Sequence, residues 1–308
     1  MSRAYDYVTV DVFTSERFAG NPLAVIPDAR GLTTLEMQAI AREFNYPEST
    51  FVLPAQHPER TNADAHVRIF TPLTEVPFAG HPNIGTALVL ASKPELFGRR
   101  IGDKLIFEET AGLVPVDILR DGGAVSGARL EAPQQLSLSG HRTVAEVARA
   151  ARMDLAAVVT AVHLPVIASV GLPFLIVELN SLATLGQLTR EGDYRSILSL
   201  DGADAVLFYV RAADALEGTS RQIAIRARMM SPFDGIGEDP ATGSANAALA
   251  ALLMSLEPNV QQLGLTIDQG IEMGRPSRLD VTASQSNGKV TVHVEGRVAT
   301  VRSGKIRV

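Results

Sequence analysis

Two segments of the chain place a titratable side chain directly before a proline where a helix is expected to begin. His81 precedes Pro82 in the first segment, and Asp239 precedes Pro240 in the second. Proline suits the first turn of a helix because it has no N–H group to lose there. The free backbone N–H groups and the helix dipole at such a start favour an anion. Each segment could therefore orient a small carboxylate.

The two segments follow one pattern: His or Asp, Pro, two variable positions, Gly, Thr or Ser, then Ala. A second pair, Gly20-Asn21-Pro22 and Gly171-Leu172-Pro173, occurs in the same order, and both spacings are close to half of the 308 residues. This favours tandem duplication of one domain over two unrelated Gly-Pro turns. Taken singly, His81 and Asp239 would be only helix caps. With a duplication, both helix starts would face one cleft between the two lobes.

Glu48 is the third candidate for chemistry. It follows an expected helix and precedes the apolar strand at residues 50–53. A carboxyl group that is partly desolvated beside apolar residues has a raised pKa and can carry a proton near neutral pH. The alternative interpretation is an exposed charge in a loop.

The composition excludes several classes of chemistry. The chain has no cysteine, so acid–base work must come from carboxylates, histidines, lysines or tyrosines. Its six histidines show no metal-ligand spacing, and no metal site is predicted. Ser244 lies in Thr-Gly-Ser-Ala-Asn, which is not the nucleophile elbow of a serine hydrolase. A net charge of −6 argues against nucleic-acid and anionic-membrane partners. No targeting or membrane segment is evident, and a soluble cytoplasmic protein is expected.

The elements that must position these residues alternate between strands and helices. Thr33 and Glu36 form an expected capping box for a helix that buries Met37, Ile40, Ala41 and Phe44. Strands are expected at residues 7–13, 23–26, 50–53, 66–70, 124–130, 166–170, 174–179, 205–210 and 222–228. After a turn at residues 80–85, helices are expected at 86–91, 144–151, 155–162 and 241–253. Asn287-Gly288 predicts a hairpin near the end of the chain.

These elements predict an α/β (α+β) protein of two similar lobes. The N-terminal lobe is expected to span residues 1–132 and the C-terminal lobe residues 133–297. The boundary is placed near Pro133, where a strand gives way to a polar stretch.

Five segments together resemble the phenazine biosynthesis protein PhzF-like family, which has the diaminopimelate epimerase-like fold. The resemblance covers essentially the whole chain. The segments are Asp11-Val12-Phe13, residues 18–25, residues 45–51, residues 78–87 and residues 238–245. The last of these, Glu-Asp-Pro-Ala-Thr-Gly-Ser-Ala, is highly specific to the family.

The resemblance implies two pseudo-symmetric domains, each a curved mixed sheet around a central helix, with the C-terminal strand at 298–308 pairing back onto the first lobe. It also implies a homodimer and a cofactor-independent isomerase. The namesake of the family isomerises trans-2,3-dihydro-3-hydroxyanthranilate by moving a proton between ring carbons. The catalytic residues carried over are Glu48 as the proton carrier and His81 and Asp239 as orienting groups. The substrate-binding residues carried over are Gly80, Gly85, Thr242, Gly243 and Ser244.

The chain departs from the family pattern beside the catalytic glutamate. The namesake pattern is close to Asn-Leu-Ser-Glu-Thr-x-Phe, whereas Tyr46 and Pro47 precede Glu48 here. Pro47 alters the shape and rigidity of this segment, and this bears on the substrate more than on the chemistry. The expected function is proton transfer on a small carboxylated cyclic or amino-bearing metabolite. The alternatives are a lyase or dehydratase that begins with the same proton abstraction, and a non-catalytic small-molecule-binding protein.

Overall fold

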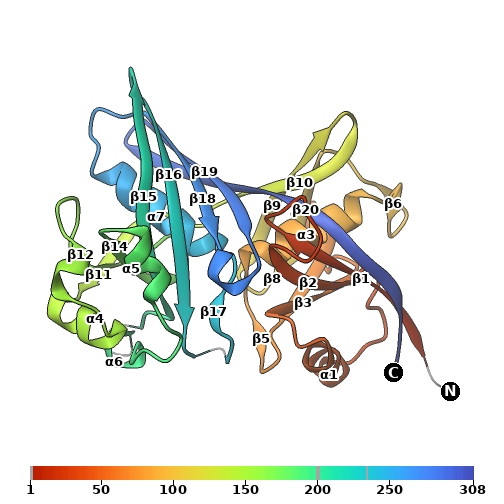
Figure 1. Ribbon diagram of the computed structural model, residues 1–308. Helices are drawn as coiled ribbons and strands as arrows, with labels where there is room; N and C mark the ends of the chain where they lie inside the picture. Colours follow the sequence, from red (N-terminus) through yellow and green to blue (C-terminus); the bar gives the residue numbers. More distant parts are fainter. Residues whose placement is uncertain (1–2, 199–201, 234) are drawn as a thin grey trace. The chain divides into compact units, whose positions relative to one another are not determined.

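The structure is a computed structural model that describes residues 3–198, 202–233 and 235–308. The chain forms two compact units. Unit 1 comprises Met1–Glu131 and Glu295–Val308, and unit 2 comprises Ala132–Val294. Figure 1 follows the elements of both units along the chain.

Unit 1 is built mainly from strands. Its helices are α1 (Thr34–Phe44), α2 (Pro58–Thr61) and α3 (Gly80–Ala91). Its strands are β1 (Ala4–Val12), β2 (Asn21–Ile26), β3 (Glu48–Leu53), β4 (Ala65–Phe70), β5 (Glu75–Val76), β6 (Glu95–Leu96), β7 (Arg99–Arg100), β8 (Lys104–Glu109), β9 (Gly112–Asp121), β10 (Ala124–Glu131) and the later part of β20 (Lys289–Arg307).

The pairing of these strands brings distant segments together. β2 lies parallel to β3, with Leu23 opposite Glu48. β20 lies antiparallel to β1, from the pair Val12 and Val298 to the pair Ala4 and Arg307. The end of the chain therefore belongs to the sheet of unit 1.

Helix α3 lies at the centre of unit 1. Every residue from His81 to Ala91 is buried, and the helix contacts β1, β2, β3, β9 and β10. Gly85 permits this close packing, because a Cβ atom there would lie 2.6 Å from Leu23 Cδ2 and 2.9 Å from Val12 Cγ2. A side chain at position 85 would push the helix away from β1 and β2.

Unit 2 repeats the arrangement around α7 (Gly243–Ser255), which is buried over most of its length and contacts β13, β14, β18 and β19. Its other helical elements are α4 (Val144–Ala151), η1 (Leu155–Ala157), α5 (Leu182–Gln187), α6 (Arg195–Leu198) and η2 (Ile271–Met273). Its strands are β11 (Ser137–His141), β12 (Val158–Val159), β13 (Val166–Ser169), β14 (Pro173–Leu179), β15 (Ala205–Glu217), β16 (Ser220–Ser231), β17 (Gly237–Asp239), β18 (Gln262–Gln269), β19 (Ser277–Ser286) and the first part of β20.

Most of the expected elements are confirmed, including the mixed α+β class and the sheet around a central helix. Thr33 and Glu36 form the expected capping box of α1. The helix expected at 155–162 is wrong. Only the single turn η1 forms there, and Val158 then pairs with Leu179 of β14. The β-branched Val158-Val159 pair favours a strand, and this outweighs the apolar pattern on which the helix was predicted.

The two helix starts also differ from the expectation. α3 begins at Gly80, so His81 is the second residue of the helix and not its cap. The segment expected as a turn is thus the first turn of α3. In unit 2, Asp239 ends β17 and α7 begins only at Gly243, with Thr242 at the N-cap. Pro240 therefore lies between β17 and the helix.

Candidate functional site

Glu48 and His81 lie together in unit 1. Glu48 is the first residue of β3, and His81 belongs to the first turn of α3. His81 Nε2 lies 3.6 Å from Glu48 Oε2. The His81 side chain is 6% exposed and the Glu48 side chain 19% exposed, so the carboxylate is the more accessible of the two.

Burial determines the charge of His81. It lowers the pKa of the imidazole to about 3, against a weaker opposing effect of a hydrogen bond to the Pro22 backbone. Nε2 has no hydrogen-bond partner among the described residues, so the bond to the Pro22 carbonyl comes from Nδ1–H. His81 is therefore neutral at pH 7, and its Nε2 lone pair is directed to the Glu48 side.

This arrangement has a defined chemical use. Nε2 and the Glu48 carboxylate are both acceptors, and their separation exceeds a hydrogen bond. A ligand N–H or O–H that approaches beside the two atoms would supply the donor that Nε2 lacks among the described residues. A proton carried by Glu48 would do the same. The pair can therefore bind a polar hydrogen of a ligand while one carboxylate exchanges a proton.

Of the other residues predicted in unit 1, Gly80 is the first residue of α3 and is half-buried. No side chain caps this helix start, so its backbone N–H groups remain suited to an anion. The Cβ direction of Gly85 faces Leu23 and Val12. Helix packing is enough to explain the glycine at 85, and its substrate-binding role stays a prediction.

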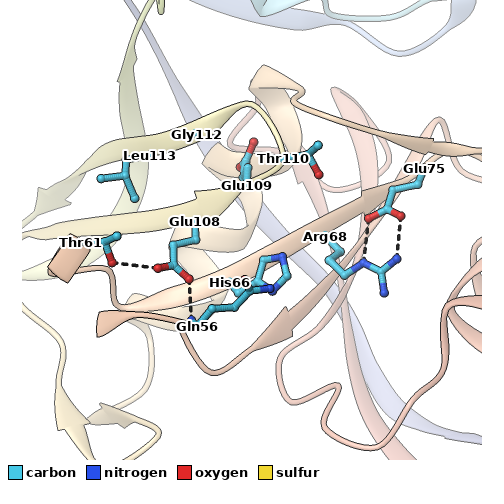
Figure 2. A pocket seen from close by; sticks show the side chains of 10 residues that line it. All are labelled: Gln56, Thr61, His66, Arg68, Glu75, Glu108, Glu109, Thr110, Gly112 and Leu113. Atoms are coloured by element: carbon cyan, nitrogen blue, oxygen red, sulfur yellow. Dashed lines mark hydrogen bonds and ion pairs between the residues drawn. The ribbon is translucent and has the colours of Figure 1, made fainter. Parts of the chain in front are cut away.

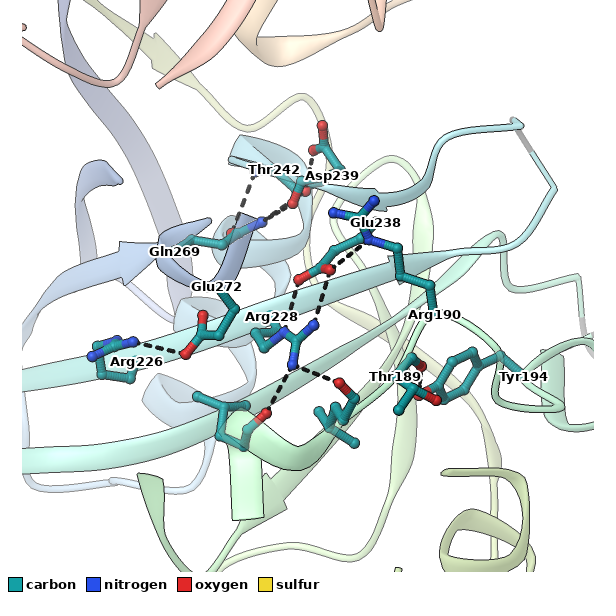
Figure 3. A network of polar contacts seen from close by, with 12 residues as sticks. Thr189, Arg190, Tyr194, Arg226, Arg228, Glu238, Asp239, Thr242, Gln269 and Glu272 are labelled. Atoms are coloured by element: carbon teal, nitrogen blue, oxygen red, sulfur yellow. Dashed lines mark hydrogen bonds and ion pairs between the residues drawn. The ribbon is translucent and has the colours of Figure 1, made fainter. Parts of the chain in front are cut away.

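The predicted residues of unit 2 lie in a closely bonded group (Figure 3). Thr242 Oγ1 donates a hydrogen bond to Asp239 Oδ2. Gln269, at the end of β18, donates from Nε2 to the Asp239 backbone carbonyl at 2.8 Å and accepts from Asn246 Nδ2 at 2.9 Å. Gly243 is the first residue of α7 and is buried, and Ser244 follows it, half-buried.

A buried ion pair anchors the residue before Asp239. Arg228 Nε and Nη2 donate to the two carboxylate oxygens of Glu238 at 2.7 and 2.9 Å. Arg228 Nη1 also donates to the backbone carbonyls of Leu185 and Leu188 at 3.1 and 2.8 Å. The Glu238 side chain is 1% exposed. This bidentate pair fixes β17, which carries Asp239.

Unit 1 also contains a polar cavity of about 600 Å³, lined by Gln56, Thr61, His66, Arg68, Glu75, Glu108, Glu109, Thr110, Gly112 and Leu113 (Figure 2). Its charged side chains are mostly paired within the protein. Arg68 donates to both oxygens of Glu75 at 2.7 and 2.6 Å, and Glu108 accepts from the Gln56 backbone at 2.6 Å. The exception is Glu109, whose two carboxyl oxygens have no hydrogen-bond partner among the described residues.

The described parts of the chain contain no group of three or more His, Asp or Glu side chains placed to hold a metal ion.

Comparisons with known proteins decide the family. Residues 10–304 match the family described as phenazine biosynthesis-like protein. The chain belongs to this family. An uncharacterized isomerase of Mesorhizobium japonicum is 36% identical over 98% of this chain and 98% of the relative. The trans-2,3-dihydro-3-hydroxyanthranilate isomerase of Pseudomonas aeruginosa is 35% identical over 97% of this chain and 98% of the relative.

Solved structures agree with this membership. The crystal structure of the Bacillus anthracis phenazine biosynthesis protein of the PhzF family has a TM-score of 0.83, covering 99% of this chain and all of that chain. At 21% identity it shows a shared fold. The names of the curated relatives support an isomerase, the enzyme class expected from the sequence. Within the described residues, no helix is long and apolar enough to cross a membrane.

The sequence patterns do not predict three buried polar side chains of the structure, those of Glu109, Glu238 and Gln269. For Glu109 a signal was present. β8 alternates, with Leu105, Phe107 and Glu109 on its buried face, so a carboxyl group stands where an apolar residue is expected. Gln269 likewise lies at the end of a strand, β18. Its partners Asp239 and Asn246 are distant from it in the sequence, so no local pattern indicates them.

Proposed function

We propose that this protein is a cofactor-independent isomerase that moves a proton within a small carboxylated cyclic or amino-bearing metabolite. Glu48 is the general base and acid. The observation that carries the proposal is the Glu48 carboxylate beside the neutral, buried His81, whose Nε2 has no donor among the described residues. The 35% identity to trans-2,3-dihydro-3-hydroxyanthranilate isomerase supports that compound as the type of substrate.

In the proposed reaction, Glu48 removes a proton from a carbon next to an activating group. The C–H electron pair moves into the substrate π system. Glu48 holds the proton, which exchanges with solvent, and then delivers a proton to a different carbon. No electron leaves the substrate and no group is lost, so the reaction is an isomerisation. A carboxyl group positioned for both steps contributes about 10²–10⁴-fold to the rate.

The remaining predicted residues are assigned to binding. His81 Nε2 accepts a hydrogen bond from a substrate amine or hydroxyl group. Asp239 orients a polar group of the substrate, and its bonds to Thr242 and Gln269 fix its position. The uncapped first turns at Gly80 and at Gly243–Ser244 bind the carboxylate and any negative charge that develops on it.

The test is proton NMR of the protein with trans-2,3-dihydro-3-hydroxyanthranilate in D₂O. The wild type is expected to form the isomer with deuterium at the carbon that receives the proton. Glu48→Gln is expected to lose about 10²–10⁴-fold of this rate. Glu43→Gln, which alters an exposed carboxyl group of α1, is the matched control and should react as the wild type.

Three results would change the proposal. Turnover that persists in Glu48→Gln would reject the role of Glu48. A product that has lost water would support the lyase instead. If the wild type leaves this compound unchanged, this substrate type is wrong for the chain.

A homodimer and a cytoplasmic location complete the proposal. The homodimer rests on the family resemblance, and light scattering of the purified protein tests it. Fractionation of the source cells tests the location.

A further inference from the structure

Thr50 and Thr86 form a buried contact between the two elements that carry Glu48 and His81. Their Oγ1 atoms lie 2.7 Å apart and share a hydrogen bond, and both residues are 0% exposed. Thr50 belongs to β3, which begins at Glu48, and Thr86 belongs to α3, which contains His81. The proposed reaction uses neither hydroxyl group.

The contact lies on the same face of β3 as the Glu48 carboxylate. Side chains alternate along a strand, so Glu48 and Thr50 point to one face. That face meets α3, because Glu48 contacts His81 and Thr50 contacts Thr86. Phe51 points to the other face, where it belongs to the buried hydrophobic cluster that contains the apolar residues of α1. The two polar contacts of β3 are therefore made with one helix.

The two contacts have similar spacings along the strand and along the helix. Thr50 follows Glu48 by two residues, which span about 6.6 Å in a strand. Thr86 follows His81 by five residues, which span about 7.5 Å in a helix. One placement of α3 on β3 therefore satisfies both contacts. A slide of α3 along β3 that separates His81 from Glu48 would also break the hydrogen bond between the threonines, since such a bond tolerates only a few tenths of an ångström.

Unit 2 provides a reference for this part of the fold. Leu23 and Phe174 each follow the proline of the repeated Gly-x-Pro segment and begin equivalent strand pairings. Leu23 lies opposite Glu48 in the parallel pair of β2 and β3, and Phe174 lies opposite Ala205 in the parallel pair of β14 and β15. The position of the Glu48 carboxylate is thus taken by a methyl group in unit 2.

The same register assigns Leu207 of unit 2 to the position of Thr50. Thr50 pairs with Val25 and Leu207 with Ile176, and both Thr50 and Leu207 are 0% exposed. An apolar side chain therefore fits this place in the fold. The hydroxyl group occurs in the unit whose strand also carries the carboxylate, so the fold alone does not account for it.

A hydrogen bond restricts movement in a way that an apolar contact does not. It has a narrow range of distance and angle, whereas hydrophobic contact is not directional. Loss of one hydroxyl group leaves its buried partner unsatisfied and destabilises the protein, but replacement of both by apolar groups of the same shape can be nearly neutral. Stability and positioning can therefore be separated by experiment.

We propose that Thr50 and Thr86 are positioning residues, whose hydrogen bond fixes α3 against β3 and so holds His81 Nε2 at its separation from the Glu48 carboxylate. The inference rests on the proposed function, because it concerns the site of that reaction. Both hydroxyl groups are buried, so they act through Glu48 and His81 and not on the substrate.

The central variant is Thr50→Val/Thr86→Val, which removes the hydrogen bond and leaves no unpaired hydroxyl group. Valine has nearly the shape of threonine, so the double variant is expected to unfold at the urea midpoint of the wild type. Thr50→Val alone leaves the Thr86 hydroxyl unpaired and should unfold at a lower urea concentration.

The first measurement is NMR of the whole protein without substrate, with ¹⁵N-labelled histidine. The His81 ring signals are identified by their absence in His81→Gln. In the double variant they are expected to shift and broaden, because the distance to the Glu48 carboxylate is no longer fixed.

Thr9→Val is the matched control for this measurement. Thr9 is a buried threonine of β1 whose Oγ1 has no hydrogen-bond partner among the described residues. It points away from α3, since the neighbouring Val10 is the residue that faces Gly85 of that helix. Its replacement should leave the His81 signals as in the wild type.

The second measurement is the isomerase assay. The double variant is expected to lose about 10-fold to 100-fold in kcat with KM nearly unchanged, because a small misplacement of a reacting group costs up to about 10²-fold. Thr50→Ser/Thr86→Ser keeps both hydroxyl groups and should retain most of the activity. A purely structural role would instead make activity follow the urea midpoints.

His81 signals of a folded double variant that match the wild type would overturn the proposal, and so would an unchanged kcat. Thr50→Val alone takes the place of the double variant if that protein does not fold, with the same expected shift. Because the NMR measurement needs no substrate, it decides the proposal even if the wild type does not isomerise the compound tested. Failure of the proposed function and failure of this inference are thus distinguishable.

Discussion

The two units hold their site-bearing helices in different ways. In unit 2, hydrogen bonds fix the segment around the start of α7: Asn246 donates to Gln269, and Thr242 donates to Asp239. The Arg228–Glu238 ion pair anchors the strand before this segment. In unit 1, buried acceptors on two titratable residues have no donor among the described residues, namely Nε2 of His81 in α3 and both carboxyl oxygens of Glu109 at the end of β8. Asn83 Oδ1 and its unit 2 counterpart Asn246 Oδ1 also lack one. Unit 2 is thus built to hold a fixed shape, whereas unit 1 has groups that can take up or release protons. A reaction that moves a proton requires both properties.

The largest expected effect tests how firmly unit 2 is held. Glu238→Ala leaves the Arg228 guanidinium buried without its counter-charge, and we expect a loss of about 3–5 kcal/mol in the free energy of unfolding. Urea unfolding monitored by circular dichroism measures it. Arg190→Ala is the control, because Arg190 contacts the same carboxylate at 3.1 Å with a side chain that is 51% exposed. It should cost at most about 1 kcal/mol. Equal losses in the two variants would contradict the assigned role of Arg228.

A second prediction makes unit 2 resemble unit 1. Gln269→Glu replaces the donor to the Asp239 carbonyl by an ionisable group in a fully buried position. We expect a loss of about 2–3 kcal/mol in the free energy of unfolding at pH 8. The loss should be smaller at pH 5, where the introduced carboxyl group is protonated and can donate. Unfolding at the two pH values measures it. A loss that does not change with pH would show that the donor at this position is unimportant.

A third prediction concerns the packing of α3. Gly85→Ala places a methyl group 2.6 Å from Leu23 Cδ2, and we expect a loss of about 1–2 kcal/mol in the free energy of unfolding. Gly186→Ala in α5 is the matched control, since a Cβ atom there meets nothing within 4 Å. Thermal unfolding of both variants gives the comparison. If the Gly85 variant is as stable as the control, the contact with β2 is looser than the distances indicate.

The smallest expected effect is the acid sensitivity of unit 1. The native pKa of His81, about 3, lies below its ordinary value of 6.5. Between these values the unfolded chain binds more protons, so the free energy of unfolding falls as the pH decreases from 6.5. From pH 6 to pH 5 the wild type should lose about 1 kcal/mol more than His81→Gln. His141→Gln, at an exposed histidine, should behave as the wild type. Equal slopes in all three proteins would refute a neutral buried His81.

The sequence predicted the elements whose signals are local. The Thr33–Glu36 capping box is confirmed, and α4 spans Val144–Ala151 as expected. Asn287 and Gly288 have φ angles of 51° and 75°, and they join β19 to β20 as a hairpin turn with two left-handed residues requires. Each of these features depends on neighbours within a few residues.

Features that depend on distant residues were not predictable in this way. At the start of α7, the backbone N–H of Thr242 donates to Gln269 Oε1, which follows Thr242 by 27 positions. The neutral state of His81 results from burial, which outweighs the opposing hydrogen bond to the Pro22 carbonyl, and the pattern around His81 contains neither feature. The repeat correctly pointed to two related helix starts, but it aligned His81 with Asp239. The structure instead aligns Asn83 with Asn246, because α7 begins later in its segment than α3.

The long strand β20 has a consequence for how the chain is made. Unit 1 needs residues 298–307 of β20 as the partner of β1, yet all of unit 2 is translated before them. While the ribosome synthesises unit 2, the first unit is one strand short and β1 has an open edge. Open strand edges invite pairing with other chains. A chain that lacks residues 295–307 would therefore join unit 2 to a first unit whose β1 edge is open and prone to aggregation.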